Sequence, residues 1–243
     1  MIAAVGNKST EVDINFLILS GGNEDSVNGA YFSGALSLYS HDIVKMTNSI
    51  VSNNFGEDGL NIKSSKVLLK NNTFLSNYSD QVDLDNTIGH VSGNNFSVQN
   101  ENSSNGDGLD LSGSKISIQG NNFSYFKDKG ISVGEESEAV IFENTFSDNE
   151  NGMAIKDSSI VHLKGNTFNN NIADINMYVK KNIFNEPVLY LANKNNFNGV
   201  IKSNTRKNIF YNQNFNPWDI IEEIYESNPK QLYFLKEELK LDD

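Results

Sequence analysis

The chain has 243 residues and no cysteine, and its 19 basic and 31 acidic residues give a formal net charge of −12. The lack of cysteine excludes disulfides, cysteine-ligated zinc and a thiol nucleophile. The acidic balance argues against nucleic acids and anionic membrane surfaces as partners, because both repel negative charge. No apolar run is long enough to cross a bilayer, and no basic-then-apolar leader follows Met1. We therefore expect no transmembrane segment.

A short motif, Asn-x-Phe, recurs along the chain. Six copies lie between Asn72 and Phe197, at spacings of 22 to 29 residues. Each copy is preceded by an apolar pair and followed by another that flanks a polar residue, as in Leu109-Asp110-Leu111. Three short period-two segments per repeat, without helical spacing, are typical of a parallel β-helix, in which each coil pairs with the next. The sequence predicts an all-β solenoid of about seven coils over residues 1–205.

The register of the repeats predicts which side chains lie inside the coil. Two aliphatic interior columns are expected: Leu60, Val82, Leu109, Ile131, Met153 and Ile175 in the first, and Ile62, Leu84, Leu111, Val133, Ile155 and Met177 in the second. A third column is aromatic: Phe74, Phe96, Phe123, Phe146 and Phe168. The asparagine two residues before each phenylalanine should point inward, so that its amide bonds to the amide of the next coil. We interpret these asparagines as structural.

These repeats resemble the right-handed parallel β-helix repeat family, the pectate-lyase-like class, over residues 13 to about 205. The resemblance implies a right-handed coil but says little about function, because lyases, hydrolases, epimerases, adhesins and stalks share this repeat. The stretches 106–114, 128–135 and 155–159 are also similar to β-helix regions of bacterial surface proteins that carry spore-coat-H-like kinase domains. No kinase motif occurs in this chain, so such an activity would belong to another domain.

The polar residue between two inward apolar residues must point outward, so successive copies should form outer columns. The column between the apolar pairs reads Asn61, Asp83, Asp110, Ser132, Ala154 and Asn176, and the column two positions later reads Lys63, Asp85, Ser112, Gly134 and Lys156. At the turn before each strand the column reads Asp58, Asp80, Asp107, Lys129 and Asn151. Neighbouring coils are roughly 5 Å apart, so like charges in one column would repel unless a cation or ligand offsets them.

These columns contain the candidate site. A calcium ion, which needs several carboxylate oxygens, would be held by Asp83, Asp85, Asp107 and Asp110. A ligand would contact Asp83, Asp110, Ser132 and Lys156. By resemblance to those pectate lyases that pair bound calcium with a lysine base, Lys129 and Asp110 would be the catalytic residues, and two neighbouring carboxylates would also suit a glycoside hydrolase. The alternative is a solvated acidic face that Lys129 partly neutralises. The insertion Gln99–Asn105, just before Asp107, should overhang this face.

The two ends of the solenoid differ in sequence. Asn216-Pro217 and Asn228-Pro229 each read as an N-cap followed by proline in the first turn, so residues 206–243 are predicted to form a helical hairpin that caps the last coil. The apolar faces would be Trp218, Ile221, Ile224 and Tyr225 in the first helix, and Leu232, Leu235 and Leu239 in the second. The N-terminus has no comparable cap, which suggests that an upstream coil, domain or leader is absent. His41, His90 and His162 fall in different coils and are expected on different faces.

Two functions agree with these observations. The first is a non-catalytic surface or extracellular module for structure, adhesion or carbohydrate binding, forming part of a larger protein and contacting a polysaccharide or another protein domain. The second is a calcium-dependent enzyme acting on acidic polysaccharide, either a lyase with a lysine base or a glycoside hydrolase. Either function suits a secreted or cell-surface protein, with a cytoplasmic location as the alternative.

Overall fold

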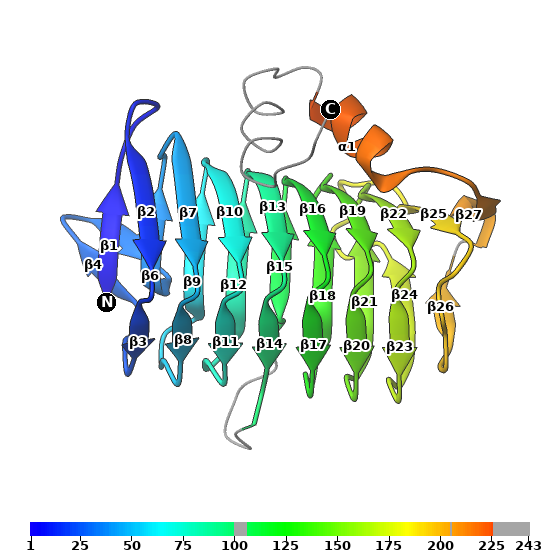
Figure 1. Ribbon diagram of the computed structural model, residues 1–243, viewed down its shortest axis with the longest axis horizontal. Coiled ribbons are helices and arrows are strands. Elements are labelled where there is room, and N and C mark those ends of the chain that lie inside the picture. The colour runs from blue at the N-terminus through cyan, green and yellow to red at the C-terminus, as the bar shows by residue number, and fades with distance from the viewer. Residues whose placement is uncertain (100–105, 205, 226–243) are drawn as a thin grey trace.

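The computed structural model describes residues 1–99, 106–204 and 206–225. It confirms a parallel β-solenoid of about seven turns (Figure 1). Three parallel sheets, which we call A, B and C, run the length of the coil. The described part of the chain contains no helix long and apolar enough to cross a membrane.

The strands of each sheet follow one another at the repeat spacing. Sheet A consists of β1 (Ile2–Val5), β6 (Gly34–Tyr39), β9 (Asp58–Lys63), β12 (Asp80–Asp85), β15 (Leu109–Ser112), β18 (Lys129–Gly134), β21 (Asn151–Lys156), β24 (Ala173–Tyr178) and β26 (Ile201–Ser203). Sheet B consists of β2 (Glu11–Asn15), β7 (Ile43–Thr47), β10 (Lys66–Lys70), β13 (Ile88–Ser92), β16 (Lys115–Gln119), β19 (Glu138–Phe142), β22 (Ile160–Lys164), β25 (Val188–Ala192) and β27 (Ile209–Gln213). Sheet C consists of β3 (Ile18–Ser20), β8 (Ile50–Ser52), β11 (Thr73–Leu75), β14 (Asn95–Ser97), β17 (Asn122–Ser124), β20 (Thr145–Ser147) and β23 (Thr167–Asn169). A hairpin of β4 (Asp25–Val27) and β5 (Ala30–Phe32) forms a separate antiparallel sheet, and a short 3-10 helix spans Arg206–Asn208.

The interior columns are confirmed. Parallel in-register pairing places Leu60, Val82 and Leu109 side by side, and the same register continues through the later coils. Every residue of both predicted aliphatic columns is fully or almost fully buried. The predicted phenylalanines stack, with ring centroids 4.6 to 5.1 Å apart, and the stack continues to Phe197. A continuous apolar core therefore fills the coil.

The asparagine column forms the expected ladder. From Asn72 to Asn195, each side-chain Nδ2 donates to the Oδ1 of the ladder asparagine of the next coil at 3.0 to 3.2 Å. The same Oδ1 also accepts the backbone N–H of the preceding ladder residue. A second ladder was not predicted: Asn54 donates to Asn77, and Asn149 donates to Asn171. Its signal in the sequence is an asparagine five residues after a ladder position, as at Asn149.

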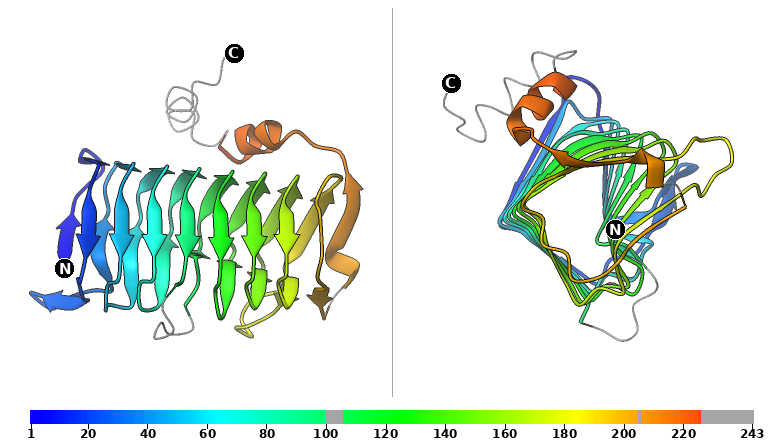
Figure 2. Two further views of the ribbon diagram at one scale, coloured as in Figure 1. Left: turned by 60° about the horizontal axis from the view of Figure 1, so that its bottom comes forward. Right: turned by 90° about the vertical axis from the view of Figure 1, so that its right-hand side faces the viewer.

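The C-terminal helix lies elsewhere than expected. Helix α1 (Pro217–Tyr225) begins at the predicted N-cap, where the Asn216 Oδ1 accepts the N–H of Trp218 at 3.3 Å. It rests on the outer side of sheet B instead of covering the last coil (Figures 1 and 2). The segment before it adds strand β27 to that sheet, so the solenoid extends beyond residue 205. The predicted second helix, with Leu232, Leu235 and Leu239, lies outside the described residues.

Helix α1 packs against several neighbouring coils of sheet B. The Tyr225 hydroxyl donates to the carbonyl of Gly89 at 2.8 Å and also contacts the carbonyl of Lys115 at 3.1 Å. The helix packs on Val140 and Phe142, which point outward from β19. Because these contacts fall on β13, β16 and β19, the helix spans three neighbouring coils.

Candidate binding surface on sheet A

The outer face of sheet A carries the three predicted polar columns. Strand pairing places Asn61, Asp83, Asp110 and Ser132 in consecutive coils of the middle column, which we call the central column. The turn column is likewise confirmed by the pairing of Asp58 with Asp80 and of Lys129 with Asn151. The third column runs from Val5 and Tyr39 to Tyr178, and it contains Lys63, Asp85, Ser112, Gly134 and Lys156. The register of the repeats therefore predicts this surface correctly.

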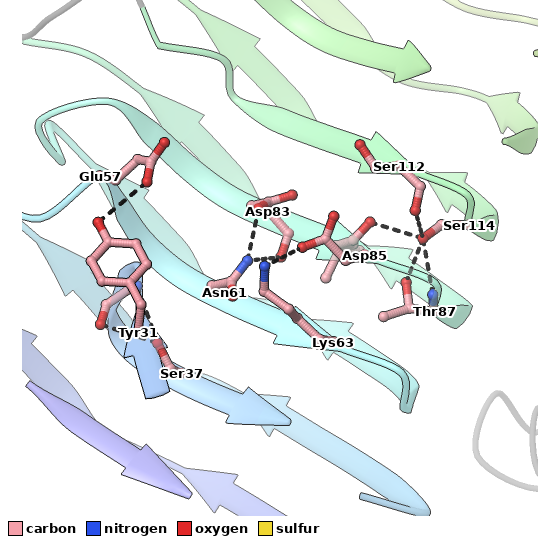
Figure 3. Close-up of polar contacts among 12 residues, drawn as sticks. Tyr31, Ser37, Glu57, Asn61, Lys63, Asp83, Asp85, Thr87, Ser112 and Ser114 are labelled. Carbon is pink, nitrogen blue, oxygen red and sulfur yellow. Dashed lines mark hydrogen bonds and ion pairs between the residues drawn. The ribbon is translucent and has the colours of Figure 1, made fainter. Parts of the chain in front are cut away.

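The central column is more buried than an outward-facing row would suggest. Asn61 and Ser132 are each 0% exposed, and Asp83 and Asp110 are half-buried. Asn61 Nδ2 donates to the Asp83 carboxylate at 2.7 Å (Figure 3). Three buried atoms of this column, Asn61 Oδ1, Asp110 Oδ1 and Ser132 Oγ, have no hydrogen-bond partner among the described residues. Buried polar atoms are normally hydrogen-bonded, so three unpartnered atoms in one row are unusual.

The turn column gathers acidic groups around one lysine. The backbone N–H of Asp107 donates to the Asp80 carboxylate at 2.6 Å. Lys129 Nζ lies 3.0 Å from the Asp107 carboxylate and also bonds to Asp128. Burial raises the pKa of Asp58 to about 7 and raises the pKa of Asp80 well above its ordinary value. The turn column is therefore less negative than its composition suggests.

The electrostatics of Lys129 bear directly on its predicted role as a base. Burial alone would lower the pKa of the Lys129 ammonium, but Asp107 and Asp128 outweigh burial and raise the pKa above its ordinary value. The side chain is therefore protonated at neutral pH. A general base must be able to accept a proton at the working pH, and the ion pair holds Lys129 in the opposite state.

The third column contains a second ion pair and two tyrosines. Lys63 Nζ lies 2.7 Å from the Asp85 carboxylate (Figure 3) and 5.6 Å from the centre of the Tyr39 ring. At the other end Lys156 is buried and pairs in register with Tyr178. The column thus combines a paired carboxylate, a buried lysine and two tyrosines.

The four residues predicted to hold calcium lie on neighbouring coils in three different columns. Asp85 and Asp107 are each paired with a lysine, and Asp83 accepts a hydrogen bond from Asn61. Within the described ranges, no group of three or more histidine or acidic side chains is arranged to hold a metal ion. The calcium site stays a prediction. Most of the insertion predicted to overhang this face, residues 100–105, lies outside the described part of the chain.

The histidine prediction was wrong for two of the three residues. His90 and His162 lie in one column on the outer face of sheet B, separated by Ser117 and Val140. The repeat contained the signal for this alignment, because His90 and His162 each stand four residues before a ladder asparagine, Asn94 and Asn166. His90 is fully buried, and His162 stacks on the ring of Tyr190.

Comparison with known proteins supports the fold. No curated protein matches the chain. The narrower resemblance to surface proteins with kinase domains stays a prediction. A family model described as the right-handed β-helix region matches residues 34–215. Because this match covers well over half of the chain, the protein belongs to the right-handed β-helix family.

Proposed function

We propose that the protein is a non-catalytic binding module whose sheet A surface holds a polysaccharide along the axis of the coil. The supporting observation is the central column, in which Asn61 Oδ1, Asp110 Oδ1 and Ser132 Oγ are buried without partners in the described structure. Leaving such a group unsatisfied costs about 1–3 kcal/mol, which a suitable ligand would recover. Sugar hydroxyls both donate and accept hydrogen bonds, so they match amide, carboxylate and hydroxyl groups in one row.

The charge of the surface favours a neutral polysaccharide. The chain has a formal net charge of −12. A uronate polymer would be repelled by this field unless cations intervened. A neutral glycan carries no such cost, and the partly exposed Tyr178 of the third column offers aromatic surface to one end of it. With such a ligand the module would act at the cell surface or after secretion.

A glycoside hydrolase is the second candidate, because of one specific pair. Asp83 and Asp110 are register neighbours, and burial raises the pKa of Asp83 well above its ordinary value. Retaining glycosidases use two carboxyl groups about 5 Å apart, one protonated as the acid and one ionised as the nucleophile. Stacked strands produce such a spacing in any β-helix, so the spacing alone carries little weight. The binding module remains our conclusion.

Affinity electrophoresis tests the proposal, with gels that contain neutral polysaccharides such as xylan, galactan and β-glucan beside gels that contain polygalacturonate. We expect retardation in at least one neutral gel. Ser132→Ala should weaken retardation about tenfold, which is the effect of one lost hydrogen bond of about 1–1.5 kcal/mol. Ser97→Ala is the matched control, because Ser97 is also buried with an unpartnered hydroxyl but lies on sheet C.

A reducing-end assay on the retarding polymer separates binding from hydrolysis. The binding module releases no reducing ends. Release that is abolished by Asp110→Asn would establish the hydrolase instead. Retardation that is equal in the wild type and in Ser132→Ala would place the ligand on another surface and overturn the proposed site.

A further inference from the structure

We propose a second ligand site, on the outer face of sheet B beneath the first turn of α1, that takes a single uncharged sugar residue. The site is a cavity of about 490 Å³ between the ends of strands β10, β13 and β16 and the helix. The side chains that carry the argument are Lys70, His90, Ser92, Gln119, Glu143 and Trp218. This inference is independent of the function proposed for sheet A, because it concerns a different sheet.

Two residues of strand β13 that line this cavity, His90 and Ser92, each have a polar atom without a hydrogen-bond partner in the described structure. His90 is 0% exposed, and its Nδ1 lies 2.6 Å from the hydroxyl of Ser117. His90 Nε2 and Ser92 Oγ are both buried and have no partner within the described part of the chain. Residues 90 and 92 are two apart on a strand, so their side chains project from the same face. Both unsatisfied atoms therefore belong to one site.

The protonation state of His90 suits a hydroxyl ligand. Burial lowers the pKa of His90 to about 3, so its imidazole is neutral at physiological pH. In a neutral imidazole one ring nitrogen donates and the other accepts. Because a sugar hydroxyl can do either, it pairs with Nε2 in both tautomers, and it pairs equally well with the Ser92 hydroxyl.

Trp218 supplies the wall of the cavity. Its ring lies 6.1 Å from the ring of His90 and meets Phe142 edge-on, with centroids 5.5 Å apart. The helix that carries it is fixed at the other end by the buried Tyr225. Ligand pockets of about 300–1,000 Å³ typically combine such an aromatic wall with a few polar groups. The apolar face of a sugar ring packs against an indole in this arrangement.

The charges around the cavity point to an uncharged ligand. Lys70 and Glu143 contribute one charge of each sign. The Glu143 carboxylate accepts a hydrogen bond from Gln119 Nε2 at 3.1 Å, which orients it. A phosphate would face Glu143, and a cationic ligand would face Lys70. A neutral polyhydroxyl ring avoids both repulsions and uses both groups as hydrogen-bond partners.

Trp218 is the only tryptophan of the chain, so its fluorescence reports on this site alone. The experiment titrates the full chain with glucose, galactose, mannose, arabinose and N-acetylglucosamine, and follows tryptophan emission together with saturation-transfer NMR of the sugar protons. We expect a saturable response to at least one sugar. Ser92→Ala should weaken the affinity about tenfold, whereas Ser97→Ala, on sheet C, should not change it.

Three results would overturn the site. The first is the absence of a saturable response by both methods for every sugar. The second is equal affinity in the wild type and in Ser92→Ala. The third is a response to inorganic phosphate or acetate that no neutral sugar produces. Circular dichroism of each variant establishes that a lost response reflects the site and not unfolding.

Discussion

Replacing the ladder residue Asn144 by aspartate tests most directly how much the asparagine ladder contributes to stability. Its Oδ1 accepts the N–H of Asn121 at 2.8 Å, and its Nδ2 donates to the carbonyls of Ile118 and Phe142 and to Asn166 Oδ1 at 2.9 to 3.0 Å. Aspartate retains the acceptor but places a second oxygen against three oxygens. The two N–H donors that serve these three oxygens are lost, and either a charge or a proton must be buried.

We expect Asn144→Asp to lower the free energy of unfolding by about 2–4 kcal/mol, at about 1 kcal/mol for each lost bond plus the desolvation of the carboxyl group. For a chain of this size, a loss of 3 kcal/mol corresponds to a decrease in Tm of about 6–12 °C. Because a buried carboxyl group has a raised pKa, the folded variant retains a proton that the unfolded chain releases. The loss should therefore be smaller near pH 4 than near pH 8.

Urea unfolding followed by circular dichroism measures this loss at both pH values. The matched control is Asn122→Asp, because Asn122 is exposed and directly follows the ladder residue Asn121. The control should unfold within about 0.5 kcal/mol of the wild type. Equal midpoints for Asn144→Asp and Asn122→Asp would refute the inward ladder as a source of stability.

Three further predictions concern the outer surfaces. Wild-type stability should fall as the pH rises from about 4 to about 7, because folded Asp58, with a pKa of about 7, retains a proton that the unfolded chain releases. Asp58→Asn should reduce the total decrease over this interval by at most about 4 kcal/mol, and parallel pH profiles would contradict the assignment. The Tm of the wild type should be the same in calcium and in chelator, because lysines already pair with Asp85 and Asp107. A rise in Tm with calcium would instead support the metal site and the enzymatic alternative. Tyr225→Phe removes the one O–H donor that the carbonyls of Gly89 and Lys115 share, and it should loosen α1 by about 1–2 kcal/mol, seen as a red shift of Trp218 emission in mild urea. Unchanged emission would show that the hydroxyl contributes nothing.

The columns were predictable because a parallel in-register fold converts sequence spacing directly into position. Once Asn-x-Phe fixes the repeat, the stacking of Leu109 on Val82 and of Asp110 on Asp83 follows without further information. The aspartate pKa values did not follow, because they depend on burial. A polar residue that faces outward was expected to be solvated, yet Asn61 and Ser132 are fully buried.

The sequence of α1 does not by itself determine the surface against which the helix packs. An amphipathic face with Trp218 and Tyr225 shows that the helix packs, but not on which surface. The sequence of the strand beneath the helix did indicate this surface. Strand β19 has apolar residues on both faces, and Val140 and Phe142 point outward. An outward apolar pair on one strand of a solenoid marks where another element covers the coil.

A crystal structure of the protein with an oligosaccharide from a polymer that retards it tests the sheet A surface most directly. We predict a sugar chain that lies along the central column, with hydroxyl groups within hydrogen-bond distance of Asn61 Oδ1, Asp110 Oδ1 and Ser132 Oγ. Density for the oligosaccharide on any other face of the coil, with the central column left uncovered, would contradict it.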